Sequence, residues 1–323
     1  MSPSAPKDAP SPNLPMPSAV SARLRTYVAE RLQPRLLPVV VLVFAMGLLY
    51  GKAIVGTKSL HISVVDVIGV FGVVGYIVLA RVFDEHKDYE FDVAHLADRP
   101  LPRGAISWSE VNALGFVGLL AQVVICVIED AGIGKVCAWW AIAFGFLVLT
   151  RYEFFIRAWL RRHFVTNTLT HLPVYCLVAL WSAEIGAHPK WIGWSAIWLG
   201  GYMYVHTFGL DLWRKSHAPE DELPSVDSYT AIWGTTNASV AAIVLVAATA
   251  ALAGAMLQAA HVTSVAPYVA LAVLMLPMTV GLVRFALTPN RRTSTVARNV
   301  LIVTVATVDL TLILSLAIGR GLS

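Results

Sequence analysis

Runs of about 20 apolar residues recur along almost the whole chain, and they constrain its fold more than any other feature. A helix of that length crosses the hydrocarbon core of a bilayer and satisfies its own backbone polar groups. The composition agrees, because 57% of the 323 residues are hydrophobic and only 14% are charged. Soluble domains are roughly 45–50% apolar and about 25% charged. The sequence therefore predicts an all-α polytopic membrane protein.

Nine apolar segments can be marked along the chain. The segments cover roughly residues 36–55, 63–83, 111–128, 136–155, 169–185, 191–213, 236–259, 266–287 and 297–318. Residues 1–18 are rich in Pro, Ser and Ala and lack the apolar core of a signal peptide. We expect a disordered tail over residues 1–18, followed by one nine-helix transmembrane domain over residues 19–323.

The basic residues are distributed very unevenly between the two sides of this layout. Nineteen of the 24 Lys and Arg residues fall before segment one and in or near the loops after segments two, four, six and eight. The other side has only Lys52, Lys58, Lys135, Lys190 and Arg320. Because basic residues concentrate on the cytoplasmic side, we expect a cytoplasmic N-terminus and an external C-terminus. The expected location is a bacterial inner membrane.

The acidic residues are also concentrated, and 11 of the 20 lie in two cytoplasmic loops, over residues 84–98 and 211–227. Both loops contain basic residues as well. Each loop is therefore a candidate site for a ligand that is anionic and bound to a metal ion. No nucleic-acid partner is expected.

The first acidic loop has a helical spacing. If segment two continues as a helix, Glu85, Asp88 and Asp92 lie within about 60° of one another, with Asp84 beside Asp88. Carboxylates on one stripe repel each other unless a cation lies between them. Mg²⁺ prefers one or two carboxylates together with phosphate oxygens. The alternative interpretation is a solvated loop whose own basic residues screen the acids.

The same loop ends in the sequence "DRPLPRG". Its two prolines stiffen the backbone, so Arg99 and Arg103 are held on a rigid turn. A planar guanidinium suits phosphate oxygens. These two arginines are therefore candidate diphosphate ligands, and contact with lipid headgroups is the alternative.

This stretch resembles the first aspartate-rich motif of the UbiA superfamily of intramembrane prenyltransferases. The family pattern is Asn-Asp-x-x-Asp-x-x-x-Asp, followed shortly by a turn of the type Arg-Pro-Leu-Pro-x-Gly. Asp84 stands at the Asn position and Glu85 at the first Asp, while Asp88 and Asp92 match the second and third. Residues 99–104 match the turn, and the nine-span layout also agrees.

The resemblance implies a nine-helix UbiA-type bundle with its active site on the cytoplasmic side. It implies an isoprenyl diphosphate substrate, Mg²⁺ as cofactor and a lipid-soluble or aromatic acceptor within the membrane. By the same resemblance Asp84, Glu85, Asp88 and Asp92 are metal ligands, and Asp88 and Asp92 are catalytic. Two alternatives stay open: a terpene cyclase on the same scaffold, and a non-catalytic lipid-binding or transport protein.

The second loop departs from the family's second motif, which typically carries Asp-x-x-x-Asp. Asp221 aligns with the second Asp, but His217 stands at the first, with Arg214 and Lys215 nearby. We favour Arg214 and Lys215 as catalytic residues that neutralise the diphosphate directly, because basic residues repel a metal ion and hold a phosphate. Asp221 and Glu222 are the expected metal ligands of this loop. Glu220 and Asp211 are alternative sources of the missing ligand, and Asp227 is expected to cap the helix that follows.

Candidates for the acceptor or prenyl pocket are more scattered. In "TRYEFFIRAWLRRHF" a helical spacing would place Tyr152, Phe155 and Trp159 on one face, with Arg157 available to the diphosphate. An interfacial aromatic belt with snorkelling arginines is the alternative. The pocket candidates are Tyr152, His171 and Tyr229, although His171 can equally be a hydrogen-bonded core residue.

Two acidic residues, Asp66 and Asp309, lie inside apolar segments. Ionisable residues within a membrane span are functional candidates by default. Asp66 lies near the outer end of its segment, which favours a structural role. For Asp309, in the middle of its segment, both readings stay open.

Overall fold

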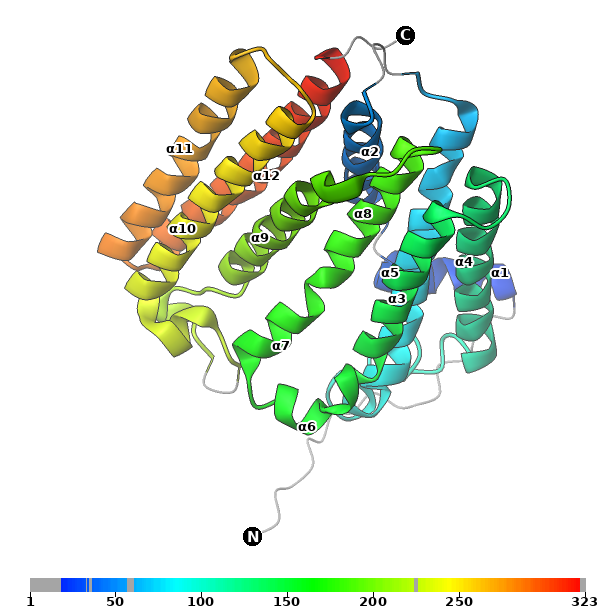
Figure 1. Ribbon diagram of the computed structural model, residues 1–323. Coiled ribbons are helices and arrows are strands. Elements are labelled where there is room, and N and C mark those ends of the chain that lie inside the picture. The colour runs from blue at the N-terminus through cyan, green and yellow to red at the C-terminus, as the bar shows by residue number, and fades with distance from the viewer. Residues whose placement is uncertain (1–18, 33, 35–36, 57–60, 224–225, 320–323) are drawn as a thin grey trace. The chain divides into compact units, whose positions relative to one another are not determined.

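The computed structural model describes residues 19–32, 34, 37–56, 61–223 and 226–319, and the expected tail over residues 1–18 lies outside them (Figure 1). All regular elements of the described residues are helices. By backbone contacts the chain divides into two compact units, which we call the smaller and the larger unit. The smaller unit comprises residues 1–40 and 71–124, and the larger unit comprises residues 41–70 and 125–323.

The smaller unit contains the first helices and most of two long ones. These are α1 (Val20–Tyr27), the π-helical turn η1 (Val28–Leu32), and the greater parts of α3 (Val64–His95) and α4 (Trp108–Glu129).

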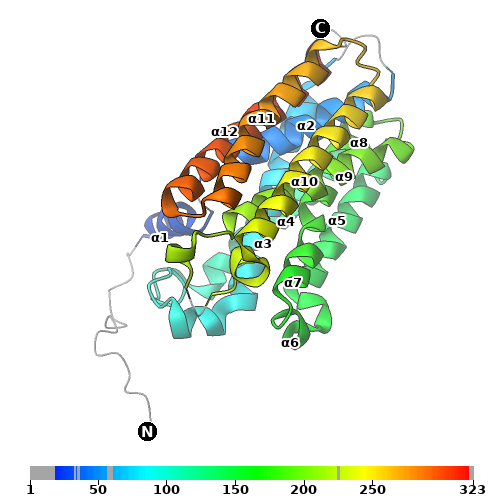
Figure 2. The same ribbon diagram turned by 90° about the vertical axis from the view of Figure 1, so that its left-hand side faces the viewer.

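The larger unit contains most of α2 and the remaining helices. They are α2 (Leu37–Ile54), α5 (Lys135–Arg151), α6 (Arg157–Leu160), α7 (Phe164–His171), α8 (Pro173–Ala187), α9 (Ala196–Arg214), α10 (Tyr229–Ala259), α11 (Ala266–Leu287) and α12 (Arg291–Ile318). Short 3₁₀ turns lie at Glu153–Phe155 (η3), Gly193–Ser195 (η4) and Pro219–Asp221 (η5). Helices α10, α11 and α12 run side by side in both views (Figures 1 and 2).

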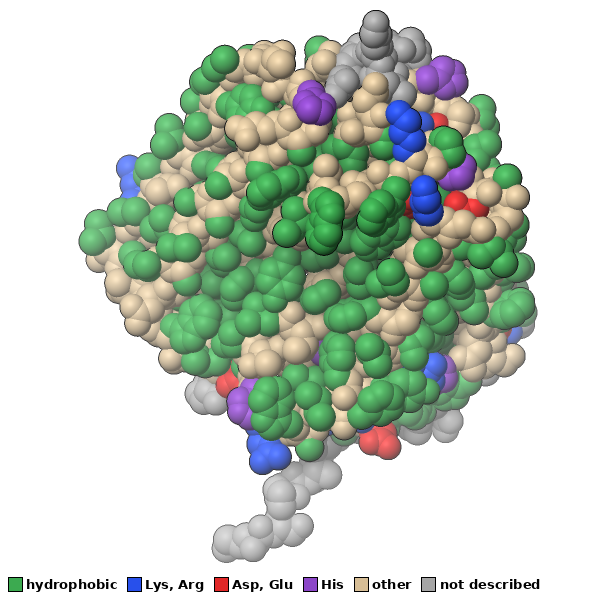
Figure 3. Space-filling model, in the orientation of Figure 1, with side chains coloured by type: hydrophobic (Ala, Val, Ile, Leu, Met, Phe, Trp, Pro, Cys, Tyr) green, Lys and Arg blue, Asp and Glu red, His purple; other side chains and the backbone are tan. Residues whose placement is uncertain are grey.

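Seven helical stretches of the described residues are long and apolar enough to cross a membrane. They are α2, α3, α4, the α7–α8 stretch Phe164–Ala187, α10, α11 and α12. Two further predicted segments, 136–155 and 191–213, contain α5 and α9, which are not among the seven. Hydrophobic side chains cover most of the face drawn in Figure 3, and charged side chains lie toward its upper and lower ends. Such a surface is typical of an integral membrane protein.

Helix α3 runs without a break from Val64 to His95, so Asp84, Glu85, Asp88 and Asp92 are helical, as assumed for their spacing. Helices α3 and α4 approach closely where Gly75 faces Gly118, since a Cβ on either glycine would crowd the backbone of the other. A buried cluster that includes Tyr27, Val82 and Ile106 joins α1 to this pair. The part of α3 that carries the acidic residues is therefore packed against α1.

In the larger unit, α2 and α8 pack through small residues. An added Cβ on Gly51 would overlap the backbone of Ala183, and one on Gly186 would overlap the carbonyl of Leu48. Gly47 lies one turn before Gly51 and faces Ala179 in the same way. Small residues spaced by four let helix backbones approach within a membrane, where dispersion contacts replace the hydrophobic effect. The α2–α8 contact therefore depends on the absence of side chains.

This packing predicts that Gly51→Ala destabilises the protein. Overpacking of this kind typically costs about 1–3 kcal/mol, so the thermal unfolding midpoint of the purified protein in detergent should fall. Gly145→Ala, in α5, is the matched control, because an added Cβ there meets nothing within 4 Å. The control should be neutral or slightly stabilising. Equal midpoints for the two variants would contradict the close α2–α8 contact.

Candidate functional site

The first acidic motif lies on the last turns of α3, and its four carboxylates fall into two environments. Glu85 and Asp92 are buried, with 2% and 1% exposure. Asp84 and Asp88 are half-buried. Because seven residues are nearly two full turns, Glu85 and Asp92 share one face of the helix.

The two buried carboxylates are paired with arginines. Nε of Arg31 lies 2.5 Å from Oε1 of Glu85, and the Tyr27 hydroxyl donates to the same oxygen at 3.4 Å. Nη1 of Arg99 donates to both carboxylate oxygens of Asp92, at 2.7 and 2.6 Å. Nη2 of Arg31 is 3.9 Å from Asp92. Arg31 therefore interacts with both buried acids, as burial of a charge requires.

The second arginine of the turn is also paired. Arg103 forms a two-pronged ion pair with Glu30, with N–O distances of 2.9 and 2.7 Å. The hydrogen bond from Arg103 lowers the pKa of Glu30 below its ordinary value. The turn is thus joined to η1 by one pair and to α3 by the Arg99–Asp92 pair.

Asp84 and Asp88 are the less buried carboxylates of the motif. They lie one turn apart on α3, and the Asp84 side chain is 40% exposed. The ion pairs of Asp84 are long, 3.5 Å to Arg81 and 3.3 Å to Lys87. Two accessible carboxylates fit a Mg²⁺ ion that completes its shell with water and phosphate oxygens. Glu85 and Asp92 are engaged by Arg31 and Arg99 in this arrangement.

Sequence reasoning missed the contribution of the N-terminal helices. Arg23, Tyr27 and Arg31 recur every four residues, and they contact Glu110, Glu85 and Glu85 in turn. That spacing was the available signal, because residues four apart share one helix face. The partners lie far away in the sequence, so the spacing alone did not identify them.

In the second loop, Asp211 is the centre of a polar cluster. Its carboxylate accepts from Arg214 at 2.7 Å and lies 2.9 Å from Nζ of Lys215. The hydroxyls of Thr168 and Tyr229 each donate to it at 3.3 Å. Two cations against one carboxylate leave a formal charge of +1, and the Arg214 side chain is 71% exposed. The cluster is suited to an anion rather than to a metal ion.

The expected metal ligands of this loop have other partners. Asp221 pairs with Arg291, whose Nη2 lies 2.5 Å from Oδ1, and this hydrogen bond lowers the pKa of Asp221. Glu222 accepts from the hydroxyls of Ser228, at 2.8 Å, and Thr230, at 2.5 Å. Throughout the described residues, no three His, Cys, Asp or Glu side chains are grouped so that they could hold a metal ion.

The capping prediction for Asp227 was wrong. Ser228 is the N-cap of α10, because its hydroxyl accepts from the backbone N–H of Ala231 at 2.9 Å. A serine is as good a cap as an aspartate, so sequence preference alone could not choose between these neighbours.

Tyr229 lies at the centre of an aromatic group. Its ring centroid is 5.0 Å from that of Phe164, 5.1 Å from Trp233 and 6.2 Å from Phe208. Nζ of Lys215 lies 5.2 Å from the centre of the Phe164 ring. The anion-suited cluster therefore borders a group of aromatic rings.

The helical face predicted for Tyr152, Phe155 and Trp159 is wrong. Helix α5 ends at Arg151, and the next three residues after Tyr152 have φ values of +48°, +53° and +61°. These left-handed conformations are unfavourable for L-residues and break the helix. Tyr152 is 51% exposed and stacks on Phe155.

The two other candidates near this break have local partners. Arg157 lies 3.0 Å from the Glu153 carboxylate. Nδ1 of His171 is 2.7 Å from the carbonyl oxygen of Asn167, and its ring meets the Phe154 ring edge-on at 5.7 Å. The structure thus brings His171 against the broken segment through Phe154.

Known proteins resemble this chain in fold. No curated protein sequence matches the chain. A solved structure described as giving insights into digeranylgeranylglyceryl phosphate synthase in membranes is similar, with a TM-score of 0.68 and 16% identity over 92% of this chain and 99% of that chain. The apo structure of a UbiA homolog from Aeropyrum pernix K1 has a TM-score of 0.58 and 17% identity, over 83% and 98%. These likenesses show a UbiA-like fold.

The profile of the UbiA prenyltransferase family matches residues 40–304, which include both acidic loops and most of the helices described above. With that match over most of its length, the chain belongs to the UbiA prenyltransferase family.

Proposed function

We propose that the protein is a Mg²⁺-dependent intramembrane prenyltransferase that ionises an isoprenyl diphosphate and transfers the prenyl group to a lipid-soluble or aromatic acceptor. The observation that carries this proposal is the pair of accessible carboxylates, Asp84 and Asp88, on the α3 helix that ends at the arginine-bearing turn. Family membership supports the same class of reaction.

In the first motif, Asp84 and Asp88 would hold the Mg²⁺, and Asp92 would position Arg99. When bound, the ion would neutralise negative charge on the departing diphosphate. Glu85 holds Arg31, from η1, against the face of α3 that also carries Asp92. Arg99 and Arg103 have planar guanidinium groups that can transfer hydrogen bonds from their present carboxylates to phosphate oxygens.

In the second loop, Arg214 and Lys215 would bind the diphosphate directly. As the C1–O bond of the donor breaks, its electron pair leaves with the diphosphate, and fixed cations stabilise that charge. Asp211 holds Lys215 in position. Asp221 and Glu222 would keep the structural pairings seen here with Arg291 and Ser228.

The carbon that loses the diphosphate becomes an allylic cation, which an acceptor captures with loss of a proton. Aromatic faces stabilise such a cation, and the rings around Tyr229 are the candidates. Tyr152 and His171 stay proposed pocket residues. The Tyr152 ring stacks on Phe155 and the His171 ring meets Phe154, so both contact the same aromatic segment. Arg157 stays a proposed diphosphate ligand.

We further propose nine spans, with α5 and α9 added to the seven, a cytoplasmic N-terminus and the acidic loops on the cytoplasmic side. The support is the concentration of 19 of the 24 basic residues on that side. In inverted membrane vesicles, the Asp98→Cys variant should react with an impermeant maleimide at its new thiol. No reaction beyond that of the unmodified chain would exclude this orientation.

The reaction class is tested by incubating the purified protein with geranyl, farnesyl and geranylgeranyl diphosphates. We expect diphosphate release that needs both Mg²⁺ and an added acceptor, and that stops with EDTA. Release without acceptor, together with a cyclic hydrocarbon or alcohol, would identify a terpene cyclase instead. If no donor releases diphosphate, the lipid-binding or transport alternative replaces the enzyme.

Asp88→Asn should lower kcat by roughly a hundredfold or more, because it removes a charged ligand that acts in the transition state. Raising the Mg²⁺ concentration should restore part of the loss. Glu90→Gln is the matched control, since Glu90 is exposed about 200° away on the same helix. Full activity of the Asp88→Asn variant would rule out its metal role.

Lys215→Gln should raise KM for the isoprenyl diphosphate about tenfold, since a charge-assisted hydrogen bond to the substrate is lost. Arg214→Gln should act in the same direction. Arg292→Gln, an exposed arginine in the first turn of α12, controls for the loss of one positive charge. The phosphate-binding role fails if KM for Lys215→Gln equals that of the control.

A further inference from the structure

A group of three polar side chains is buried between α9 and α12, within the larger unit. The Tyr202 hydroxyl donates to Oδ1 of Asp309 at 2.6 Å. Nε2 of His206 lies 3.6 Å from the same oxygen, which is too long for a hydrogen bond. The Tyr202 and His206 rings stack at 5.1 Å. Tyr202 is fully buried, and His206 is 9% exposed.

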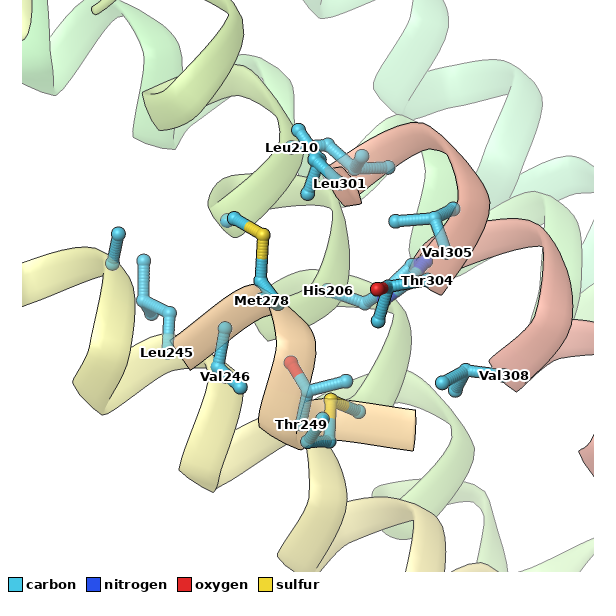
Figure 4. Close-up of a pocket in the computed structure, with 13 residues that line it drawn as sticks. His206, Leu210, Leu245, Val246, Thr249, Met278, Leu301, Thr304, Val305 and Val308 are labelled. Atoms are coloured by element: carbon cyan, nitrogen blue, oxygen red, sulfur yellow. The ribbon is translucent and has the colours of Figure 1, made fainter. Parts of the chain in front are cut away.

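His206 opens onto a cavity between α9, α10, α11 and α12. The cavity has a volume of about 40 Å³. Figure 4 shows His206 on the α12 side of this space, with Leu245 and Met278 on the other side. Most of its lining is aliphatic or methionine, and Thr249 and Thr304 add two hydroxyl groups.

One atom in this wall is left without a partner. Nε2 of His206 is buried and has no hydrogen-bond partner among the described residues. In apolar surroundings an unsatisfied polar atom is costly, and no bulk water is available to pair with it. His206, whose ring carries this atom, lines the cavity, so a ligand oxygen that reaches Nε2 would satisfy it.

We propose that this cavity binds the hydroxyl end of a long-chain aliphatic alcohol from the membrane. Two hydrogen bonds of about 2.8 Å from one oxygen easily bridge atoms 3.6 Å apart. A hydroxyl both donates and accepts, so it can pair with His206 on the cavity wall and donate to the Asp309 carboxylate that lies behind it, outside the lining. A carbonyl oxygen can only accept.

The size of the cavity selects a slender ligand. An aromatic ring occupies a cavity of roughly 150 Å³, several times the space present. A hydroxymethyl group needs far less. Leu245 and Leu301, which line the cavity, are only half-buried, so the rest of the ligand chain would pass them to extend into lipid.

This site is separate from the diphosphate-binding cluster of the second loop. Asp211 follows His206 by five residues, which turns its side chain about 140° around α9. The hydroxyl partners of Asp211 come from α7 and α10, whereas His206 and Asp309 face each other from α9 and α12. Alcohol binding here therefore does not depend on the proposed reaction.

The test is photolabelling of the full chain in detergent. The probe is a long-chain primary alcohol with a diazirine beside its hydroxyl-bearing carbon and a terminal alkyne. We expect saturable labelling of peptides from α9 or α12 that line the cavity. The same probe without its hydroxyl should label these peptides at least about tenfold less well at equal concentration.

Variants identify the residue responsible. His206→Leu should weaken labelling about tenfold, and His206→Gln, which keeps a hydrogen-bonding side chain, should retain most of it. On α12, Thr304→Val changes the cavity wall, whereas Thr307→Val is the control, because the Thr307 hydroxyl donates to the Val303 carbonyl. Thr304→Val should change labelling more than its control.

Two results would overturn the proposal. Equal labelling by the probes with and without a hydroxyl would mean that the cavity holds only water or nonspecific lipid. Unchanged labelling in a folded His206→Leu protein would remove His206 from the site. If His206→Leu does not fold, the comparison of the two probes on the unmodified chain still decides the question.

Discussion

A carboxylate buried in a chain this apolar is costly unless a cation or hydrogen bonds accompany it, and several buried acids of the described residues are paired with cations. Glu85 and Asp92 are held by Arg31 and Arg99. Asp211 has Lys215 and Arg214. At the start of α3, Asp66 lies 2.9 Å from Nζ of Lys52. The pairs made by Glu85, Asp92 and Asp66 join different segments of the chain, so these polar contacts also set local geometry.

That requirement changes how the first acidic motif is understood. A stripe of like charges on one helix face indicates a metal site when only that helix is considered. The structure adds Arg31 from η1, which pairs with Glu85 and approaches Asp92, while Asp84 and Asp88 are the less buried carboxylates of the motif. The proposed Mg²⁺ site is therefore narrower than the spacing suggested.

The second loop shows the complementary case. Its basic residues gather on Asp211, while Asp221 and Glu222 stabilise the ends of α12 and α10. The two acidic loops thus differ in chemistry, with carboxylates accessible in the first and cations in excess in the second.

The sequence by itself determined the class of fold, the helical extension of α3 and the family, because hydrophobic length, 3.6-residue periodicity and a motif of fixed spacing are local properties. It also located Asp309 as an ionisable residue within a span. Only the tertiary structure decided which charges meet. Arg31 lies 54 residues from Glu85, and His206 meets Asp309 from another helix. Hydrophobic periodicity could not predict the break after α5 either, since three left-handed residues interrupt the helix that the spacing indicated. Partner choice depends on packing between distant helices, and no local pattern records it.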